Sequence, residues 1–372
     1  MMSEYERWLA QKLDDPDLTA ELEAIRDQPE EINGRFYCNL DFGTAGLRGV
    51  IGAGTNRMNV YIVRKATQGL ADYLNAHVRN ANVAIAYDSR IKSDVFAKET
   101  AAVLAANGIH AHIYPWLSPV PTLSFATRYL KCDAGVCVTA SHNPAAYNGY
   151  KVYNAAGCQI TDGAAAEVAS FIAKEPYFTE EIPSFDEFVR QGAIVYADES
   201  VEEAYLAGIR AAVPADLRGL KVAYTALNGT GYRLVPELLR GAGAEVVPVA
   251  VQCVPDENFT TCPYPNPEKR EALTLGLETA QENGCDLLVA TDPDADRVGI
   301  AVRCGERFET LTGNEVGLLL AQYLFEEKKR AGADTGRLLL IKTIVTTSLA
   351  ERIAADYGAG VINVLTGFKY IG

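Results

Sequence analysis

Residues 135–144 read Gly-Val-Cys-Val-Thr-Ala-Ser-His-Asn-Pro, so an apolar run passes directly into a polar turn. A short apolar run of this kind predicts a buried strand, and the turn after it presents the hydroxyl of Ser141. Open α/β sheets bind their ligands at the carboxyl ends of strands, which makes Ser141 a candidate nucleophile. A polar turn that only caps the next element is the competing interpretation, and this stretch alone does not choose between them.

A second apolar run, Leu287–Ala290, passes into Thr-Asp-Pro-Asp-Ala-Asp-Arg at residues 291–297. The loop carries carboxylates at alternate positions, Asp292, Asp294 and Asp296. Two such charges about 4 Å apart repel by roughly 4 kcal/mol at a surface dielectric of about 20. A hard cation that prefers oxygen ligands would remove this repulsion, and Mg²⁺ is the natural candidate.

The acidic loop allows two other interpretations. An EF-hand begins with the same alternation of aspartates but requires Gly at the sixth loop position and Glu at the twelfth. Those positions are Arg297 and Arg303 here, so the calcium loop is excluded. A solvated acidic turn without a ligand remains an alternative, although Pro293 and the preceding strand favour a fixed loop.

Apolar strands alternate with helical segments along the chain, which is typical of an α/β protein. The pattern predicts helices near residues 61–78, 96–107 and 202–211, and strands at residues 83–86, 222–225, 338–341 and 361–365. Polar turns follow two of these strands, namely Tyr-Asp-Ser-Arg at 87–90 and Asn-Gly-Thr-Gly at 228–231. Each motif is therefore expected just past the carboxyl end of a strand.

Composition limits the classes of partner. The chain has 372 residues, enough for about two or three domains. Its net charge of −14 argues against nucleic acid or an anionic membrane as a partner. The charged N-terminus lacks a signal core and the apolar runs are only strand-sized, so a cytoplasmic protein is expected. The 8 cysteines include no C-x-x-C pair and are expected to be reduced.

A third motif, Gly-Thr-Ala-Gly-Leu-Arg-Gly, occupies residues 43–49. Together with the Ser141 turn and the acidic loop, in this order along the chain, it resembles the alpha-D-phosphohexomutase superfamily. The resemblance spans most of the chain, from about Asp41 to Lys369. It is closest to the bacterial phosphoglucomutase branch, which is related to phosphopentomutases and glucose 1,6-bisphosphate synthases. Ala45 and the segment 54–59 favour that branch.

The resemblance implies an α/β fold of successive, similar three-layer domains with mixed sheets. The expected domains are 1–200 with the phosphoserine loop, 201–309 with the Mg²⁺ loop, and 310–372 as the start of a sugar-binding domain. On this reading the chain stops at Gly372 inside the third domain, and a fourth domain that grips the substrate phosphate is absent. Such a fragment is expected to bind Mg²⁺ but to show weak or no mutase turnover.

The resemblance also implies a phosphoserine mechanism. Ser141 matches the family's phosphoserine, which gives its phosphoryl group to a bound sugar phosphate and receives another from the bisphosphate intermediate. Asp292, Asp294 and Asp296 match the Mg²⁺ ligands, and a phosphoserine oxygen at Ser141 completes the set. The expected cofactors are therefore Mg²⁺ and glucose 1,6-bisphosphate, and the expected partner is a small sugar phosphate.

The resemblance also implies roles for several basic residues. Lys151 and Arg48 match catalytic cations beside the phosphate, and Arg297 matches an arginine near the substrate. The expected substrate-binding segment near the end of the chain contains Thr366, Gly367 and Lys369. Lys369 stands where many phosphomannomutases have histidine, which favours glucose over mannose chemistry.

The general acid and base are left open among His142, Lys151 and Lys369. A structural role for His142, which would orient the loop through a hydrogen bond, is an equal alternative. The expected activity is that of a phosphoglucomutase-type isomerase, which interconverts glucose 1-phosphate and glucose 6-phosphate. Phosphopentomutase, phosphomannomutase and glucose 1,6-bisphosphate synthase activities are the alternatives, followed by a metal-dependent phosphatase or a non-catalytic binding protein. The oligomeric state is not readable from the sequence.

Overall fold

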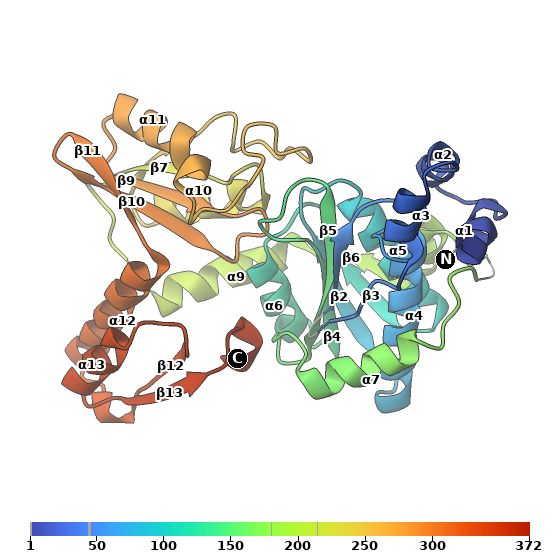
Figure 1. The fold of residues 1–372 in the computed structure, drawn as a ribbon. Helices are drawn as coiled ribbons and strands as arrows, with labels where there is room; N and C mark the ends of the chain where they lie inside the picture. Colours follow the sequence, from blue (N-terminus) through green and yellow to red (C-terminus); the bar gives the residue numbers. More distant parts are fainter. Residues whose placement is uncertain (1, 44–45, 180, 214) are drawn as a thin grey trace.

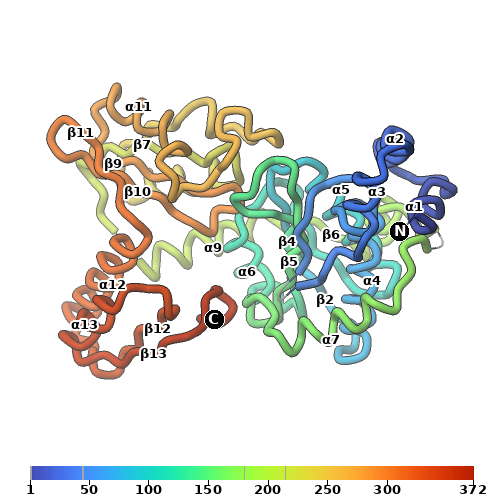
Figure 2. Tube along the Cα trace, in the orientation of Figure 1, coloured from blue at the N-terminus to red at the C-terminus, as the bar shows by residue number. Residues whose placement is uncertain are grey.

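The computed structural model describes residues 2–43, 46–179, 181–213 and 215–372. Thr44 and Ala45, and with them part of the 43–49 motif, lie outside the described residues. Three successive units are each built around one sheet, of six, five and two strands (Figure 1). In Figure 2 the trace passes from the first unit along α9 to the second, and the end of the third returns to the side of the first.

The first sheet has the strand order β1-β5-β4-β2-β3-β6. Strands β4, β2, β3 and β6 are parallel, whereas β5 runs antiparallel to both β4 and β1. The strands are β1 (Gly46–Val50), β2 (Asn82–Tyr87), β3 (His110–Ile113), β4 (Ala134–Val138), β5 (Tyr147–Asn154) and β6 (Ile194–Tyr196). The helices are α1 (Met2–Leu9), α2 (Pro16–Ala24), α3 (Pro29–Phe36), α4 (Val60–His77), α5 (Ser93–Ala106), α6 (Val120–Tyr129), α7 (Asp162–Ile172) and α8 (Phe185–Gln191).

Strand β2 shows why this sheet is covered on both faces. Val83 and Ile85 belong to the core that α4, α5 and α7 complete, while Ala84 and Ala86 pack in the core that contains α6. Successive side chains of a strand point to opposite faces, so both sets are buried only if helices cover both sides. This explains the continuous apolar run in the sequence, which is usual for parallel strands.

The second sheet has the order β11-β10-β9-β7-β8. Its strands are β7 (Lys221–Thr225), β8 (Glu245–Pro248), β9 (Leu287–Thr291), β10 (Val298–Cys304) and β11 (Arg307–Leu311). Its helices are α9 (Glu199–Ala212), η1 (Thr230–Tyr232), α10 (Leu234–Gly241), η2 (Arg270–Leu273) and α11 (Thr274–Glu282). Helix α9 begins after Asp198, whose carboxylate accepts a hydrogen bond from Ser200 N at 2.9 Å and caps the helix.

The two motif-bearing loops occupy the same place in their sheets. Ser141 lies between β4 and β5, and the acidic loop lies between β9 and β10. The strand before each loop, β4 or β9, is parallel to its neighbour β2 or β7. The strand after the loop, β5 or β10, runs antiparallel to the strand before it. The expectation of successive, similar α/β domains with mixed sheets is thus confirmed, and both loops leave the carboxyl end of a parallel strand.

The third unit begins with a helix whose N-cap is Thr312, and Thr312 forms a capping box with Glu315. Its elements are α12 (Gly313–Arg330), η3 (Thr335–Arg337), β12 (Leu339–Thr343), α13 (Leu349–Asp356), β13 (Gly360–Val364) and η4 (Phe368–Tyr370). Strands β12 and β13 are parallel, and Phe325 and Ala354 form the centre of a small core. No helix in the described part of the chain combines the length and apolarity of a membrane span.

The N-terminal helices are part of the first core. Trp8 has no exposed surface and makes edge-to-face contacts with Phe36, Tyr61 and Phe178, with ring centroids 5.9, 5.6 and 5.3 Å away. Aromatic pairs in this arrangement contribute beyond the apolar area that they bury. The segment that precedes β1 is therefore bound to the first unit by packing.

Replacing Phe36 with alanine should lower the free energy of unfolding by about 3–5 kcal/mol, because the change leaves a cavity beside Trp8. The neighbouring Tyr37 is 61% exposed and offers a matched control. Tyr37→Ala should change the free energy by no more than about 0.5 kcal/mol. Urea unfolding followed by circular dichroism measures both. Equal losses in the two variants would contradict the packing of this segment.

Candidate functional site

Ser141 lies in the turn after β4 and is only 4% exposed. Its backbone has φ 53°, in the left-handed region that few residues other than glycine adopt. The hydroxyl donates a hydrogen bond to Asp292 Oδ2 at 2.8 Å. The structure therefore brings together loops of two different sheets, from positions 151 residues apart.

The three aspartates of the acidic loop converge. One carboxylate oxygen from each of Asp292, Asp294 and Asp296 lies within 4.8 Å of the others. Asp292 and Asp294 are fully buried, whereas the side chain of Asp296 is 33% exposed. Lys151, on β5, donates from Nζ to Asp294 Oδ2 at 2.8 Å and to Asp296 Oδ2 at 3.4 Å. One ammonium group is thus shared by two carboxylates.

The charges in this cluster do not balance. Burial and the neighbouring carboxylates raise the pKa of Asp292 well above its usual range, and burial and Asp294 raise the pKa of Asp296. Burial acts in the same direction on Asp294, but the charge of Lys151 and the hydrogen bonds from Asp292, Lys151 and Thr139 together outweigh it and lower the pKa of Asp294 to about 2. The cluster therefore has an excess of negative charge that a bound cation would stabilise.

The hydrogen bonding of one carboxylate oxygen in the cluster indicates whether a metal fits. Among the described residues, Asp294 Oδ1 is buried and has no hydrogen-bond partner. A buried carboxylate oxygen without a partner is costly unless another group binds it. Carboxylate and phosphoryl oxygens are also the ligands that Mg²⁺ prefers. The carboxylates of Asp292, Asp294 and Asp296 together fit such an ion.

A buried network supports the Ser141 turn. Thr139 Oγ1 accepts a hydrogen bond from Ser141 N at 2.9 Å and donates to Asp88 Oδ2 at 2.6 Å. Asp88 Oδ1 also accepts hydrogen bonds from Arg90 N at 3.0 Å and from Ser93 Oγ at 2.8 Å. The turn after β2 thus holds the turn after β4, because the two strands are parallel neighbours.

Three basic side chains lie around the serine. His142 Nδ1 is 3.2 Å from Ser141 Oγ, and burial together with Arg297 and Arg48 lowers the pKa of His142. Arg48 is exposed on β1, where it pairs with Gly149 of β5. The backbone N–H of Arg297 donates to Asp292 Oδ1 at 3.0 Å. A lowered pKa favours the neutral imidazole, which can accept a proton.

An open hollow of about 640 Å³ adjoins this cluster. His142, Asn143 and Tyr147 line one side, and Tyr264 and Lys269 of the second unit line the other. The hollow gives the Ser141 turn a face open to solvent, although the serine itself is buried. Charged residues of both signs, Lys269 and Glu271, are among the residues that line the hollow.

Comparison with known proteins decides the family. Models of the phosphoglucomutase/phosphomannomutase family match in order: alpha/beta/alpha domain I over residues 39–178, domain II over 203–305 and domain III over 312–372. The chain belongs to the alpha-D-phosphohexomutase superfamily. The resemblance expected from the three motifs is thus confirmed.

Relatives with curated names agree with this placement. A phosphoglucomutase of Staphylococcus saprophyticus is 41% identical over 346 residues, which cover 92% of this chain and 62% of that protein. A probable phosphoribomutase of Schizosaccharomyces pombe is 36% identical and is covered to 59%. Among solved structures, a putative phosphomannomutase from Thermus thermophilus superposes with a TM-score of 0.74 at 27% identity, covering 89% of this chain and 70% of that one. The chain thus spans about 60% of the length of these curated relatives.

The end of this phosphohexomutase chain lies apart from the Ser141 cluster. Lys369 Nζ pairs with a carboxylate oxygen of Asp162 at the start of α7, and the hydroxyl of Tyr370 donates to the other oxygen at 2.8 Å. Thr366 is exposed, and Gly367 has φ 127°. The structure therefore does not bring the expected substrate-binding segment to the serine or the aspartates.

Sequence reasoning gave no role to several residues of the site. Arg90 and Thr139 bind the Ser141 turn directly, and Asp88 acts through the hydroxyl of Thr139. Phe259 of the second unit covers Arg90. In the sequence, the turn at 87–90 stands out only because it follows a strand. Its position beside β4 was the missing information, since strand order is not written in any local motif.

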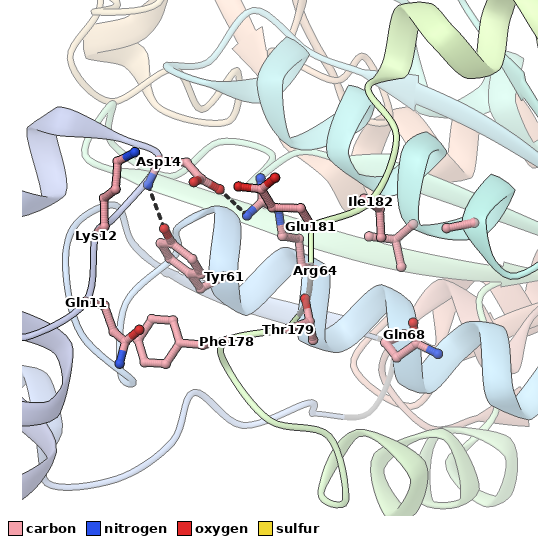
Figure 3. Close-up of a pocket in the computed structure, with 12 residues that line it drawn as sticks. Gln11, Lys12, Asp14, Tyr61, Arg64, Gln68, Phe178, Thr179, Glu181 and Ile182 are labelled. Carbon is pink, nitrogen blue, oxygen red and sulfur yellow. Dashed lines mark hydrogen bonds and ion pairs between the residues drawn. The ribbon is translucent and has the colours of Figure 1, made fainter.

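A separate cavity of about 460 Å³ lies between the N-terminal segment, α4 and α5 (Figure 3). The hydroxyl of Tyr61 accepts a hydrogen bond from Asp14 N at 2.7 Å, and Arg64 pairs with Asp14 at 2.6 Å and with Glu99 at 2.7 Å. The described residues that line it include none of the Ser141 cluster. The Arg64–Asp14 pair and the Tyr61 hydrogen bond tie the N-terminal segment to α4, and the Arg64–Glu99 pair joins α4 to α5.

Replacing Thr139 with valine should lower the free energy of unfolding by about 1–3 kcal/mol, because Ser141 N and Asp88 each lose a partner while buried. Thr127→Val is the matched control, since that hydroxyl donates only to Leu123 O within its own helix. The control should lose less than about 1 kcal/mol. Urea unfolding measures both, and a loss no larger in Thr139→Val than in the control would rule out the network.

Proposed function

We propose that this protein is a phosphosugar mutase of the phosphoglucomutase type, which interconverts glucose 1-phosphate and glucose 6-phosphate through a phosphorylated Ser141. Glucose 1,6-bisphosphate is the proposed intermediate. The contact of Ser141 Oγ with Asp292 Oδ2, at 2.8 Å, carries the proposal, because it places a hydroxyl on the rim of an acidic cluster. The 41% identity to a phosphoglucomutase supports glucose as the sugar.

Phosphoryl transfer asks a protein mainly to position the reacting groups and to stabilise charge. Mg²⁺ held by Asp292, Asp294, Asp296 and a phosphoserine oxygen would neutralise charge on the transferring group. Lys151 keeps two of these carboxylates in place through Nζ. The burial of Ser141 limits access of water, which a mutase must exclude to avoid hydrolysis.

The remaining cations have proposed roles toward the substrate. Arg48 and Arg297 lie close enough to His142 to lower its pKa, so they concentrate positive charge beside the serine. A protein of net charge −14 needs such a local concentration to attract a sugar phosphate. His142 and Lys151 lie at the cluster and stay candidates for the general acid and base. Lys369 pairs with Asp162 instead.

A ribose phosphate is the second candidate substrate. The 36% identity to a probable phosphoribomutase favours it. Both substrates use the same phosphoserine chemistry, so assays of glucose 1-phosphate and ribose 1-phosphate side by side distinguish them. A phosphatase would instead release inorganic phosphate from either sugar. A cytoplasmic location stays a prediction from composition.

Ser141→Ala should abolish phosphoenzyme formation, because the nucleophilic oxygen is removed while the turn keeps its backbone hydrogen bonds. The protein is incubated with Mg²⁺ and glucose 1,6-bisphosphate, and peptide mass spectrometry locates the phosphoryl group. The wild-type protein should gain one phosphoryl group in the peptide that contains Ser141. Ser170→Ala, an exposed serine on α7, should behave like the wild type. Phosphorylation of Ser141→Ala at the wild-type level would remove the central assignment.

Asp294→Asn should weaken Mg²⁺ binding by at least about tenfold, because it removes one negative charge and keeps the shape of the side chain. Isothermal titration calorimetry measures the affinity. Glu282→Gln is the control, because this carboxylate is exposed at the end of α11 and removes the same charge from the second unit. An equal effect of both variants would show that net charge, and not the acidic cluster, governs binding.

A further inference from the structure

Arg90 is the most completely buried basic group beside the site. It follows β2 in the turn at 87–90, and its side chain has no exposed surface. Its Nε lies 3.2 Å from Asp88 Oδ2, which is equally buried, and this contact is an ion pair without a hydrogen bond, so only the two Nη atoms of the guanidinium donate hydrogen bonds to described residues. A buried guanidinium is retained only where its N–H groups find acceptors. The partners of Arg90 therefore show what it holds.

The acceptors are main-chain carbonyls of the Ser141 turn. Nη2 donates to the carbonyl oxygens of Ser141 and of Asn143, the latter at 2.5 Å. Nη1 donates to Pro144 O at 2.9 Å and to Tyr147 O at 3.1 Å. One planar group thus spans the whole turn from its serine to the start of β5. The ammonium of a lysine lacks this fixed fork of donors.

These contacts act on a strained part of the backbone. Ser141 has φ 53°, a conformation that persists only when surrounding contacts hold it. The carbonyl of Ser141 itself is one of the acceptors of Arg90. Releasing that carbonyl would allow the residue to return to an ordinary conformation. The hydroxyl would then leave its place beside Asp292.

Phe259 joins Arg90 to the second unit. Its ring centroid lies 4.9 Å from Arg90 Cζ, and its side chain has no exposed surface. Phe259 belongs to the second unit, which also carries the acidic loop. A guanidinium over an aromatic ring is attracted to it and is shielded from water. Arg90 is therefore packed between the Ser141 turn and the unit that carries Asp292.

We propose that Arg90 is a positioning residue for phosphoryl transfer, which holds the Ser141 turn in its left-handed conformation and in register with the acidic loop. The inference rests on the proposed function of Ser141. Arg90 does not contact the reacting oxygen, and it acts through four main-chain carbonyls. A displacement of reacting groups by about 1 Å can slow a reaction about 100-fold, so loss of this fork should be visible in the rate.

Arg90→Lys is the principal test, because it keeps the charge beside Asp88 and removes the fork. The rate of Ser141 phosphorylation is measured at saturating Mg²⁺ and glucose 1,6-bisphosphate, alongside the melting temperature and Mg²⁺ affinity. The variant should be about 10- to 100-fold slower, with unchanged Mg²⁺ affinity. Arg79→Lys, at an exposed arginine, should match the wild type in every measurement. A folded Arg90→Lys protein with the wild-type rate would overturn the proposal.

Phe259→Leu provides a second variant if Arg90→Lys does not fold. It leaves the fork intact and removes only the aromatic cover, so a smaller decrease, of several-fold, is expected. A purely structural role would lower the melting temperature of both variants without changing the rate of the folded protein. An unchanged rate in folded Phe259→Leu would likewise count against the proposal.

Hydrogen exchange separates this inference from the proposed function. Amides in peptides covering residues 139–149 should exchange faster in Arg90→Lys, while those of β2 keep wild-type protection. A smaller increase is expected in Phe259→Leu, where the fork remains but loses its aromatic cover, and this variant serves if it alone folds. If the wild-type protein is not phosphorylated, the proposed function fails and exchange alone decides the positioning role. Wild-type exchange throughout 139–149 would then overturn it.

Discussion

The bond from Lys151 to Asp294 and Asp296 is the interaction on which the site depends. Without a cation, three carboxylates of one short loop would repel each other inside the protein. Removing one partner of a buried ion pair typically costs about 3–5 kcal/mol, so the lysine and the acidic loop stabilise each other. Because Lys151 lies on β5 and the loop follows β9, this bond also joins the first two units.

Each of the two loops is also held by hydrogen bonds from a neighbouring turn of its own unit. In the first unit the turn after β2 holds the Ser141 turn through Arg90, and in the second the turn after β7 holds the acidic loop. There Thr230 donates to Pro293 O from its backbone at 2.8 Å and from its hydroxyl at 2.9 Å. A Cβ on Gly229 would lie 2.2 Å from Pro293 Cα, so only glycine fits this contact. Two similar sheets therefore present two supported loops to each other.

Local charge explains how an acidic protein could act on an anion. Lys151 and Arg90 are used inside the protein, where they hold carboxylates and carbonyls. Arg48 and Arg297 are more exposed and lie near His142. The buried cations thus maintain the geometry, whereas Arg297 forms an ion pair with the exposed Glu268 at 3.9 Å. The chain has a net charge of −14, yet positively charged side chains gather around His142.

The types of the main elements, and the kind of chemistry that the motifs allow, could be predicted from the residues alone. Continuous apolar runs at 83–86 and 287–290 predicted buried strands because a strand covered on both faces needs no alternation. The acidic loop was readable as a cation site because like charges so close in sequence need a counter-ion. Domain boundaries near 201 and 310 stay predictions.

Which of these residues meet depends on how the sheets pack, and no local pattern predicts that. Ser141 and Asp292 are 151 positions apart, and their contact requires two sheets to face each other. The fork of Arg90 depends on β2 lying beside β4, and the cover of Phe259 depends on the packing of two units. Lys369 was expected near the serine but pairs with Asp162. Local patterns carry the identity of an element, whereas strand order and the packing of units arise from long-range contacts.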